Sequence, residues 1–163
     1  MTRRSERTSE APPTTNPSHP AASGADERTP SPSHPVVPSK SLRILVVDDD
    51  NVDRMALTRA LGKTGFHFTL DEADGVIAAI DRLATGPFDC VFLDYNLPDG
   101  DGLTFLRGLR GAGSSARVIM ITGQEDARVA GALIAAGAAD YIPKALVTTD
   151  RLARSLERVF GPR

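Results

Sequence analysis

Acidic residues follow two apolar runs of the sequence, and their positions predict a shared site. Three consecutive acids, Asp48–Asp50, come directly after the apolar run 42–47. Asp94 ends a second apolar run, and a Pro-Gly turn then leads the chain away. If both runs are strands of one parallel sheet, their ends lie on the same edge, where open α/β sheets bind ligands. Two such carboxylates repel by about 4 kcal/mol at ~4 Å and a surface-like dielectric, so a hard cation such as Mg²⁺ is the expected occupant.

Two further polar residues end apolar runs later in the chain. Thr122 comes after the run 117–121, and Lys144 comes after the run 140–143. At the same sheet edge they would add a hydroxyl and an ammonium to the acids. A carboxylate can attack a phosphoryl donor if a metal ion neutralises the accumulating charge, which the transition state spreads over the phosphoryl oxygens. The combination of acids, hydroxyl and ammonium is therefore suited to phosphoryl transfer.

The elements that must position these residues can be read from the apolar pattern. The predicted strands are 42–47, 66–72, 88–93, 117–121 and 140–143. The predicted helices are 51–63, 74–85, 101–110, 126–136 and 149–160. Strands that alternate with helices indicate a parallel sheet with helices on both faces, joined by right-handed crossovers. We predict an α/β, flavodoxin-like, doubly wound five-stranded parallel sheet of order 2-1-3-4-5 with five helices.

Periodicity also predicts the buried side of the helices and the edges of the sheet. In the first helix the expected core stripe is Val52, Met55, Ala56 and Ala60, widened by Leu57 and Leu61. In the second helix it is Val76, Ile77, Ile80 and Leu83. Arg54 is expected to face solvent. The alternating run 66–72 suits an edge strand, and so does the last run, because an edge tolerates the missing N–H of Pro143.

The first 40 residues differ in composition from the rest of the chain. They hold eight of the 12 prolines, with many serines and threonines. Such a segment cannot bury enough apolar surface to offset the entropy of ordering it. We therefore predict a disordered N-terminal tail over residues 1–40 and one folded domain over residues 41–161.

Composition restricts the classes of function. The net charge of −2 gives no reason to expect a nucleic-acid partner. No apolar stretch approaches the roughly 20 residues of a membrane span, and the N-terminal arginines precede no apolar signal segment. Cys90 is the single cysteine, which excludes a disulfide within the chain, and it is expected to be a small buried side chain. We therefore expect a cytoplasmic protein with no membrane partner.

Four separated motifs stand at the ends of the predicted strands. They are Val47-Asp48-Asp49, Leu93-Asp94 followed by Pro98 and Gly102, Ile121-Thr122-Gly123, and Tyr141-Ile142-Pro143-Lys144. In order and spacing they resemble the motifs of the receiver domain of two-component response regulators, in particular the single-domain chemotaxis type. The resemblance covers about residues 42–160 and none of the tail.

The resemblance implies a metal site and a phosphorylation site. Asp94 would be the phosphoacceptor. Asp49 and Asp94 would ligate Mg²⁺ directly, Asn96 would offer its backbone carbonyl, and Asp48 would act largely through water.

The resemblance also implies a switch. Thr122 and Lys144 would hold the phosphoryl oxygens, and Tyr141 matches an aromatic residue that moves inward when the threonine follows the phosphoryl group. One position departs from the family, which usually has a proline after the lysine, often with a cis bond. Here Ala145 follows Lys144. A non-proline cis bond costs about 2.5–4 kcal/mol, so we expect a trans bond.

The function implied by the resemblance is a single-domain response regulator rather than an enzyme, with only its own phosphorylation and dephosphorylation as chemistry. Its phosphoryl group would come from a histidine kinase or a histidine phosphotransfer protein, and its output would be altered contacts with an unknown target protein. A receiver-like scaffold that works without phosphorylation is the alternative, but the intact acids, Thr122 and Lys144 weigh against it. A magnesium-dependent phosphohydrolase is a third class. The acids Asp48–Asp50 match its Asp-x-Asp pattern, but this class leaves Asp94 unexplained.

Overall fold

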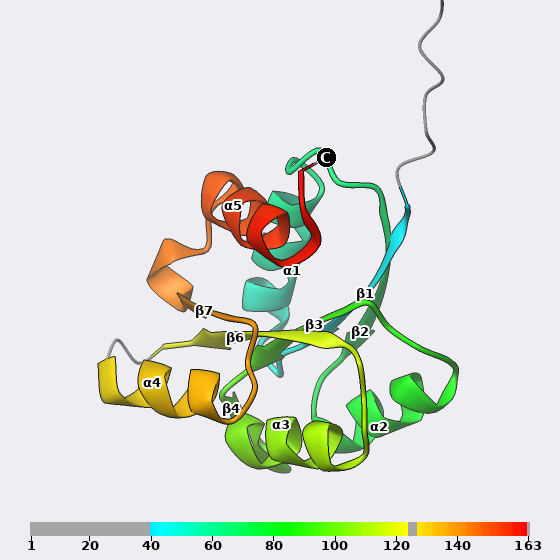
Figure 1. The fold of residues 1–163 in the computed structure, drawn as a ribbon, viewed down its shortest axis with the longest axis vertical. Coiled ribbons are helices and arrows are strands. Elements are labelled where there is room, and N and C mark those ends of the chain that lie inside the picture. The colour runs from blue at the N-terminus through cyan, green and yellow to red at the C-terminus, as the bar shows by residue number, and fades with distance from the viewer. Residues whose placement is uncertain (1–39, 124–126, 163) are drawn as a thin grey trace, which may run out of the picture. The chain divides into compact units, whose positions relative to one another are not determined.

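A computed structural model of the chain describes residues 40–123 and 127–162 (Figure 1). The predicted tail lies outside the described residues, apart from Lys40. The main sheet contains β1 (Leu42–Val47), β2 (Phe68–Ala73), β3 (Cys90–Asp94), β6 (Arg117–Thr122) and β7 (Asp140–Pro143). Neighbouring strands are parallel and lie in the order β2-β1-β3-β6-β7. This is the predicted flavodoxin-like order of five parallel strands.

Helices cover both faces of the sheet (Figure 1). They are α1 (Asn51–Leu61), α2 (Val76–Ala84), α3 (Gly102–Gly111), α4 (Ala127–Ala135) and α5 (Thr149–Phe160). Helices α1 and α5 lie on one face, and α2, α3 and α4 lie on the other. Two short elements were not predicted: a hairpin of β4 (Asn96–Leu97) and β5 (Gly100–Asp101), and the 3₁₀ turn η1 (Lys144–Leu146). Within the described ranges, no helix has the length and apolar character needed to span a bilayer.

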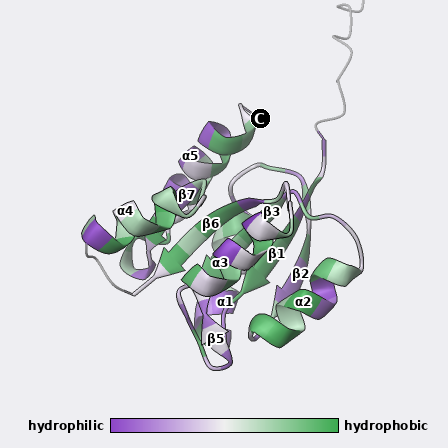
Figure 2. Cartoon of the chain, turned by 60° about the horizontal axis from the view of Figure 1, so that its bottom comes forward, coloured by the Kyte–Doolittle hydropathy of each residue, from purple (hydrophilic) through white to green (hydrophobic). Residues whose placement is uncertain are grey.

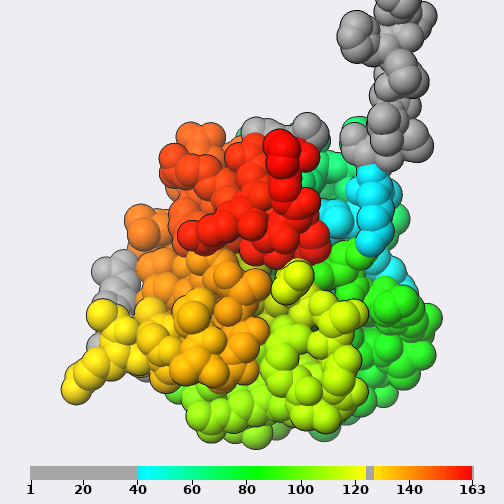
Figure 3. Space-filling model, in the orientation of Figure 1, coloured from blue at the N-terminus to red at the C-terminus, as the bar shows by residue number. Residues whose placement is uncertain are grey.

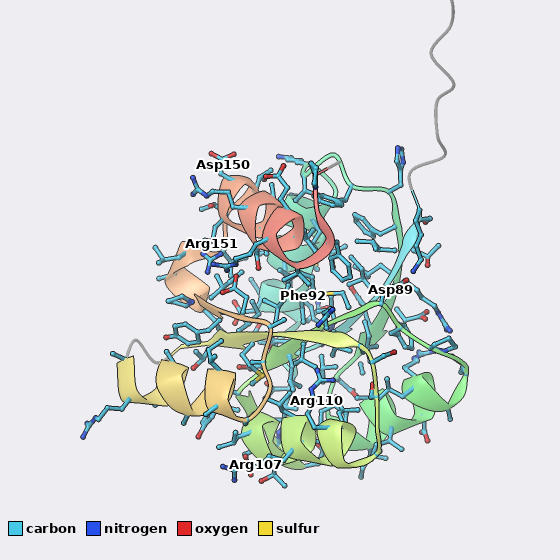
Figure 4. The ribbon with its side chains drawn as sticks, viewed as in Figure 1. Asp89, Phe92, Arg107, Arg110, Asp150 and Arg151 are labelled. Atoms are coloured by element: carbon cyan, nitrogen blue, oxygen red, sulfur yellow. The ribbon has the colours of Figure 1, made fainter. Side chains whose placement is uncertain are left out.

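The central strands are buried on both sides, as their continuous apolar sequence predicts. Strands β1, β3 and β6 are hydrophobic along most of their length (Figure 2). The core beside α1 and α5 includes Ile44, Val46, Cys90, Phe92, Ile119, Ile121 and Ile142. The core beside α2, α3 and α4 includes Leu45, Val47, Val91, Leu93, Val118 and Met120. Figure 4 places Phe92 in the first of these layers, between the sheet and α1 and α5.

Both predicted edge strands lie at the edges of the sheet. β2 and β7 are the outer strands, and Pro143 is the last residue of β7. Cys90 is fully buried, as expected, and burial raises the pKa of its thiol. A neutral, buried thiol here serves packing rather than reactivity.

The structure corrects the predicted core faces of two helices. In α1, Leu57 and Leu61 are buried, whereas Val52 and Met55 are 72% and 52% exposed. In α2, Ala79 is buried, and Ile77 and Ile80 are 68% and 54% exposed. A helix that lies on a sheet buries only a narrow stripe. Apolar residues that lie beside this stripe on the helix surface therefore face solvent.

Candidate functional site

Three aspartates meet at the C-terminal edge of the sheet. Asp48 follows β1 and Asp94 ends β3, and both are buried, with 4% and 3% of their surface exposed. Asp49 is exposed. One carboxylate oxygen from each of these three residues lies within 4.8 Å of the others. Carboxylate oxygens are the ligands that hard divalent cations prefer, so this donor set fits the Mg²⁺ site that the sequence predicts.

The start of α1 fixes the loop that carries Asp48 and Asp49. Asp50 is the N-cap of α1, and its carboxylate accepts hydrogen bonds from the backbone N–H groups of Val52 and Asp53 at 2.7 and 3.1 Å. The Asp48 carboxylate accepts from the Asp50 N–H at 2.8 Å. Arg54 donates to the Asp48 carbonyl oxygen at 2.7 Å. The Arg54 side chain is therefore mostly buried, with 15% exposed, which corrects the expectation that it faces solvent.

The turn after Asp94 is held by backbone contacts. The N–H of Asn96 donates to the Asp94 carboxylate at 3.3 Å, and the N–H of Gly102 donates to the Tyr95 carbonyl at 2.7 Å. A Cβ at Gly102 would collide with the Asp94 carbonyl oxygen and crowd Tyr95. Glycine is thus required at 102, because the backbone at the start of α3 passes directly over the end of β3.

Lys144 forms ion pairs with three aspartates. Its Nζ donates to Asp48 at 3.0 Å, to Asp94 at 3.0 Å and to Asp53 at 2.8 Å. Asp53 lies in the first turn of α1 and was not singled out from the sequence. No cis peptide bond occurs in the described ranges, so the bond from Lys144 to Ala145 is trans, as expected.

Burial and charge act in opposite directions on the groups of this site. Burial raises the pKa of Asp94, the like charge of Asp48 adds to this, and the hydrogen bond from Lys144 opposes it. Burial alone would lower the pKa of Lys144, but hydrogen bonds to Asp53, Asp48 and Asp94 outweigh burial and raise it. The ammonium is therefore fully charged at neutral pH. It is a permanent cation beside a carboxylate that is costly to ionise.

The predicted site residues line one open cleft, with the exceptions of Asp48, Thr122 and Tyr141. The cleft has a volume of about 450 Å³, and its lining residues include Asp49, Asp94, Asn96, Gly123 and Lys144. Thr122 does not line it. It is fully buried at the end of β6, directly before Gly123, and is paired in register with Pro143. Among the described residues, apart from its chain neighbours, a Cβ at Gly123 would meet no atom within 4 Å.

Tyr141 also lies outside this cleft. It lies on β7, is half-buried, and packs against the core beside α2, α3 and α4 rather than in the cleft. Its backbone carbonyl accepts a hydrogen bond from Arg151 of α5 at 2.8 Å. The structure therefore separates the ring of the predicted switch aromatic from the acids, and the backbone of the same residue connects β7 to α5.

Comparisons with known proteins agree with this geometry. The response regulator MprA of Mycobacterium tuberculosis (strain ATCC 25177 / H37Ra) is 41% identical over 116 residues, which are 70% of this chain and 49% of that protein. MprA of Mycobacterium sp. (strain KMS) is 41% identical over 115 residues, covering 69% of this chain and 48% of that protein. The chain thus spans about half the length of these curated relatives.

Solved structures show the same fold. The signal receiver domain of the response regulator NarL from M. tuberculosis superposes with a TM-score of 0.62 and 25% identity, over 71% of this chain and 97% of that chain. A response regulator from Chloroflexus aurantiacus gives a TM-score of 0.67 and 25% identity, over 74% and 98%. Chemotaxis response regulator CheY4 of Vibrio cholerae, 22% identical, matches in fold with a TM-score of 0.65, over 74% and 100%.

A family model places the match on the domain that carries the site. The model of the response regulator receiver domain matches residues 44–157, a range that includes every strand end described above. The chain therefore belongs to the response regulator receiver domain family.

Proposed function

We propose that this chain is a response regulator that accepts a phosphoryl group on Asp94 in a Mg²⁺-dependent reaction. The donor is a histidine kinase or a histidine phosphotransfer protein, and the output is a change in protein–protein contacts. The observation that carries the proposal is the position of Asp94. Its carboxylate lies within 4.8 Å of the acids after β1 and accepts a hydrogen bond from Lys144 at 3.0 Å.

The chemistry needs only positioned charges. An Asp94 carboxylate oxygen attacks the phosphorus atom, and the bond from phosphorus to the donor nitrogen breaks, leaving its electron pair on the histidine. Asp49, Asp94 and the Asn96 carbonyl would hold the Mg²⁺, with Asp48 acting through water. When bound, the ion neutralises the charge that gathers on the phosphoryl oxygens. Lys144 already lies beside Asp94 and supplies a second positive charge.

The output proposed for the domain passes through Thr122 and Tyr141. Thr122 follows the phosphoryl group, and Tyr141 then moves further inward. The position of Tyr141 supports this route: its ring packs on the α4 side of the sheet and its backbone contacts Arg151 of α5, so a moving ring would change the surface between the two helices. The surfaces of α4, the β7 region and α5 form one continuous face (Figure 3). We propose this face as the contact surface for the target protein.

Labelling with a small phosphodonor tests the proposal. Incubated with Mg²⁺ and acetyl phosphate, the protein should gain one phosphoryl group that hydroxylamine removes, as expected for an acyl phosphate. Asp94→Asn or chelation of Mg²⁺ should abolish labelling. Asp81→Asn, which removes an exposed acid of α2, should be labelled like the parent.

Two outcomes would contradict the proposal. Hydroxylamine-sensitive labelling of Asp94→Asn at the parent rate would place the acceptor on another carboxylate. Absence of labelling in the parent, combined with partner binding that phosphodonor does not alter, would support the alternative of a scaffold that works without phosphorylation.

A further inference from the structure

Lys144 uses every proton of its ammonium group on a carboxylate. An ammonium has three N–H donors. In this structure they go to Asp48, Asp94 and Asp53, at 3.0, 3.0 and 2.8 Å. Lys144 must therefore release at least one of these acids before it can donate to a phosphoryl oxygen.

The three acceptors differ in what else they are needed for. Asp48 and Asp94 belong to the group of carboxylates that can hold a metal ion, and Asp94 is also the proposed phosphoacceptor. Asp53 lies outside that group. A divalent cation held directly by Asp94, and through water by Asp48, repels the ammonium and draws electron density from the oxygens that it contacts. The contacts of Lys144 with these two acids are therefore weakened when the site is in use, and the contact with Asp53 is not.

Asp53 also differs from the other two acceptors in its surroundings. Its side chain is 45% exposed, against 6% and 4% for Asp48 and Asp94, so water continues to solvate the carboxylate. It lies in the first turn of α1, where the helix dipole favours a negative charge. Asp50 caps this helix independently, so α1 does not depend on Asp53 for its start.

We propose that Asp53 is a positioning residue that anchors the Lys144 ammonium while the metal ion and the phosphoryl group occupy Asp48 and Asp94. The anchor keeps the ammonium within reach of the phosphoryl oxygens instead of letting it move into solvent. This inference rests on the proposed function, because it assigns Asp53 a role in the same phosphorylation site.

The side-chain ammonium of Lys144 can be observed directly. The chain has three lysines, Lys40, Lys63 and Lys144, and the other two are exposed, so ¹⁵N NMR of labelled lysine gives few signals to assign. With Mg²⁺ bound, the parent and Asp53→Glu should retain a slowly exchanging Lys144 ammonium signal, and Asp53→Asn should lose it. Without Mg²⁺, all three proteins should retain the signal, because Asp48 and Asp94 then hold the ammonium.

Binding of beryllofluoride, a phosphoryl mimic that attaches to a carboxylate, gives a second readout. In the presence of Mg²⁺, Asp53→Asn should bind it about tenfold more weakly than the parent, the size of one lost hydrogen bond to a charged group. Asp53→Glu should recover most of the affinity. Asp74→Asn is the matched control. It removes an exposed acid at the same sheet edge that makes no contact with Lys144 and should leave the affinity unchanged.

The outcomes separate this inference from the proposed function. Suppose that acetyl phosphate labels the parent, that Asp53→Asn keeps the Lys144 ammonium signal, and that Asp53→Asn binds beryllofluoride as tightly as Asp74→Asn does. The anchoring role of Asp53 is then wrong, and the phosphoacceptor role of Asp94 stands. A parent with no Lys144 signal in the presence of Mg²⁺ also overturns the anchor. If the parent is not labelled and does not bind beryllofluoride, the proposed function itself fails.

Discussion

Asp94 and Asp140 are both buried aspartates on strands of the same sheet, and each contacts a basic side chain, yet their surroundings differ in charge balance. At Asp94, two further buried or nearby acids compete for the single ammonium of Lys144. At Asp140, the first residue of β7, the carboxylate receives an excess of donors. They are two N–H groups of Arg151 at 3.0 and 3.3 Å, the Ser155 hydroxyl, the Tyr141 N–H and a guanidinium N–H of Arg158.

The electrostatic consequences have opposite signs. Burial and the like charge of Asp48 raise the pKa of Asp94. Burial also pushes the pKa of Asp140 up, but hydrogen bonds from Arg151 and Ser155 outweigh it and lower the pKa. Asp140 therefore holds α5 on the sheet through these hydrogen bonds. The carboxylates around Asp94 instead repel one another, and a bound cation or a proton reduces that repulsion. The candidate site around Asp94 thus has more carboxylates than basic groups, whereas the structural contact at Asp140 has more hydrogen-bond donors than carboxylates.

The largest expected effect comes from removing the Asp140 charge. Asp140→Asn should lower the free energy of unfolding by about 3 kcal/mol, because it leaves Arg151 partly buried without its charge partner. Urea unfolding measures this. Asp150→Asn is the control. Asp150 lies on α5, next to Arg151, and points away from the sheet (Figure 4), so its substitution should change stability by ~0.5 kcal/mol at most. Equal effects of the two substitutions would contradict a structural role for Asp140.

Addition of Mg²⁺ should give the next largest change in the free energy of unfolding, and this change should depend on the acids near Asp94 and not on Asp140. At about a hundredfold excess over its dissociation constant, an ion that binds the folded state alone adds about 2.7 kcal/mol. Asp49→Ala should remove most of this gain in thermal unfolding, because Asp49 is one of the three clustered acids. Asp140→Asn should keep the gain. If Asp49→Ala responds to Mg²⁺ as the parent does, the ion binds elsewhere.

A smaller effect, opposite in sign to that of Asp140→Asn, is expected at Asp94. Without metal, Asp94→Asn should raise the free energy of unfolding by about 1 kcal/mol, because it removes a buried charge from a site with too many acids. Since the folded pKa of Asp94 is raised, its penalty is present above that pKa and fades as the pH falls through it. The advantage of Asp94→Asn should therefore shrink on acidification.

Asp140 should behave differently over the same pH range. Its folded pKa is lowered, so its stabilisation is present above the unfolded value of about 3.9 and is lost only as the pH falls through the lower folded value. Unfolding curves of both variants, measured from neutral pH down to about pH 4, compare the two sites directly. A destabilised Asp94→Asn would show that the acids around Lys144 do not store repulsion.

The smallest expected effect concerns the predicted N-terminal tail. Deletion of residues 1–38 should leave the midpoint of thermal unfolding within experimental error, because this segment carries little apolar surface to bury. The deletion keeps Lys40, whose ammonium contacts Asp89 at 2.6 Å. A midpoint lower by many degrees would show that the tail packs on the domain.

The sequence predicted the position of the site because strand ends in a parallel sheet share one edge. The strand bounds differ from the predicted ones by at most two residues, and Asp48, Asp94, Thr122 and Lys144 all lie at that edge. The order of the strands and helices in the sequence was enough to place these residues, because the position of a strand end depends on backbone pairing and not on the length of side chains. The roles given to these residues in metal binding, phosphorylation and switching stay predictions.

The sequence did not reveal how α1 is rotated about its own axis, and two contacts depend on that rotation. Val52 and Met55 are spaced like core residues, but Leu57 and Leu61 face the sheet, because the neighbouring α5 and the sheet together set the rotation of α1. The contact of Asp53 with Lys144 was missed for the same reason. An acid three positions after the N-cap was visible, but only the rotation of α1 places it against a lysine 91 residues away.

The loop after Asp94 also constrains which residues evolution can place at the start of α2. The Asp99 carboxylate accepts hydrogen bonds from the N–H groups of Val76 and Ile77 at 2.7 and 2.9 Å, and so caps α2 from a distant part of the chain. A Cβ at Gly75 would lie 2.6 Å from that carboxylate. Positions 75 and 99 should therefore covary among close relatives: an acid at 99 that caps α2 favours glycine at 75, and a larger residue at 75 should accompany a smaller one at 99 and a local cap on α2.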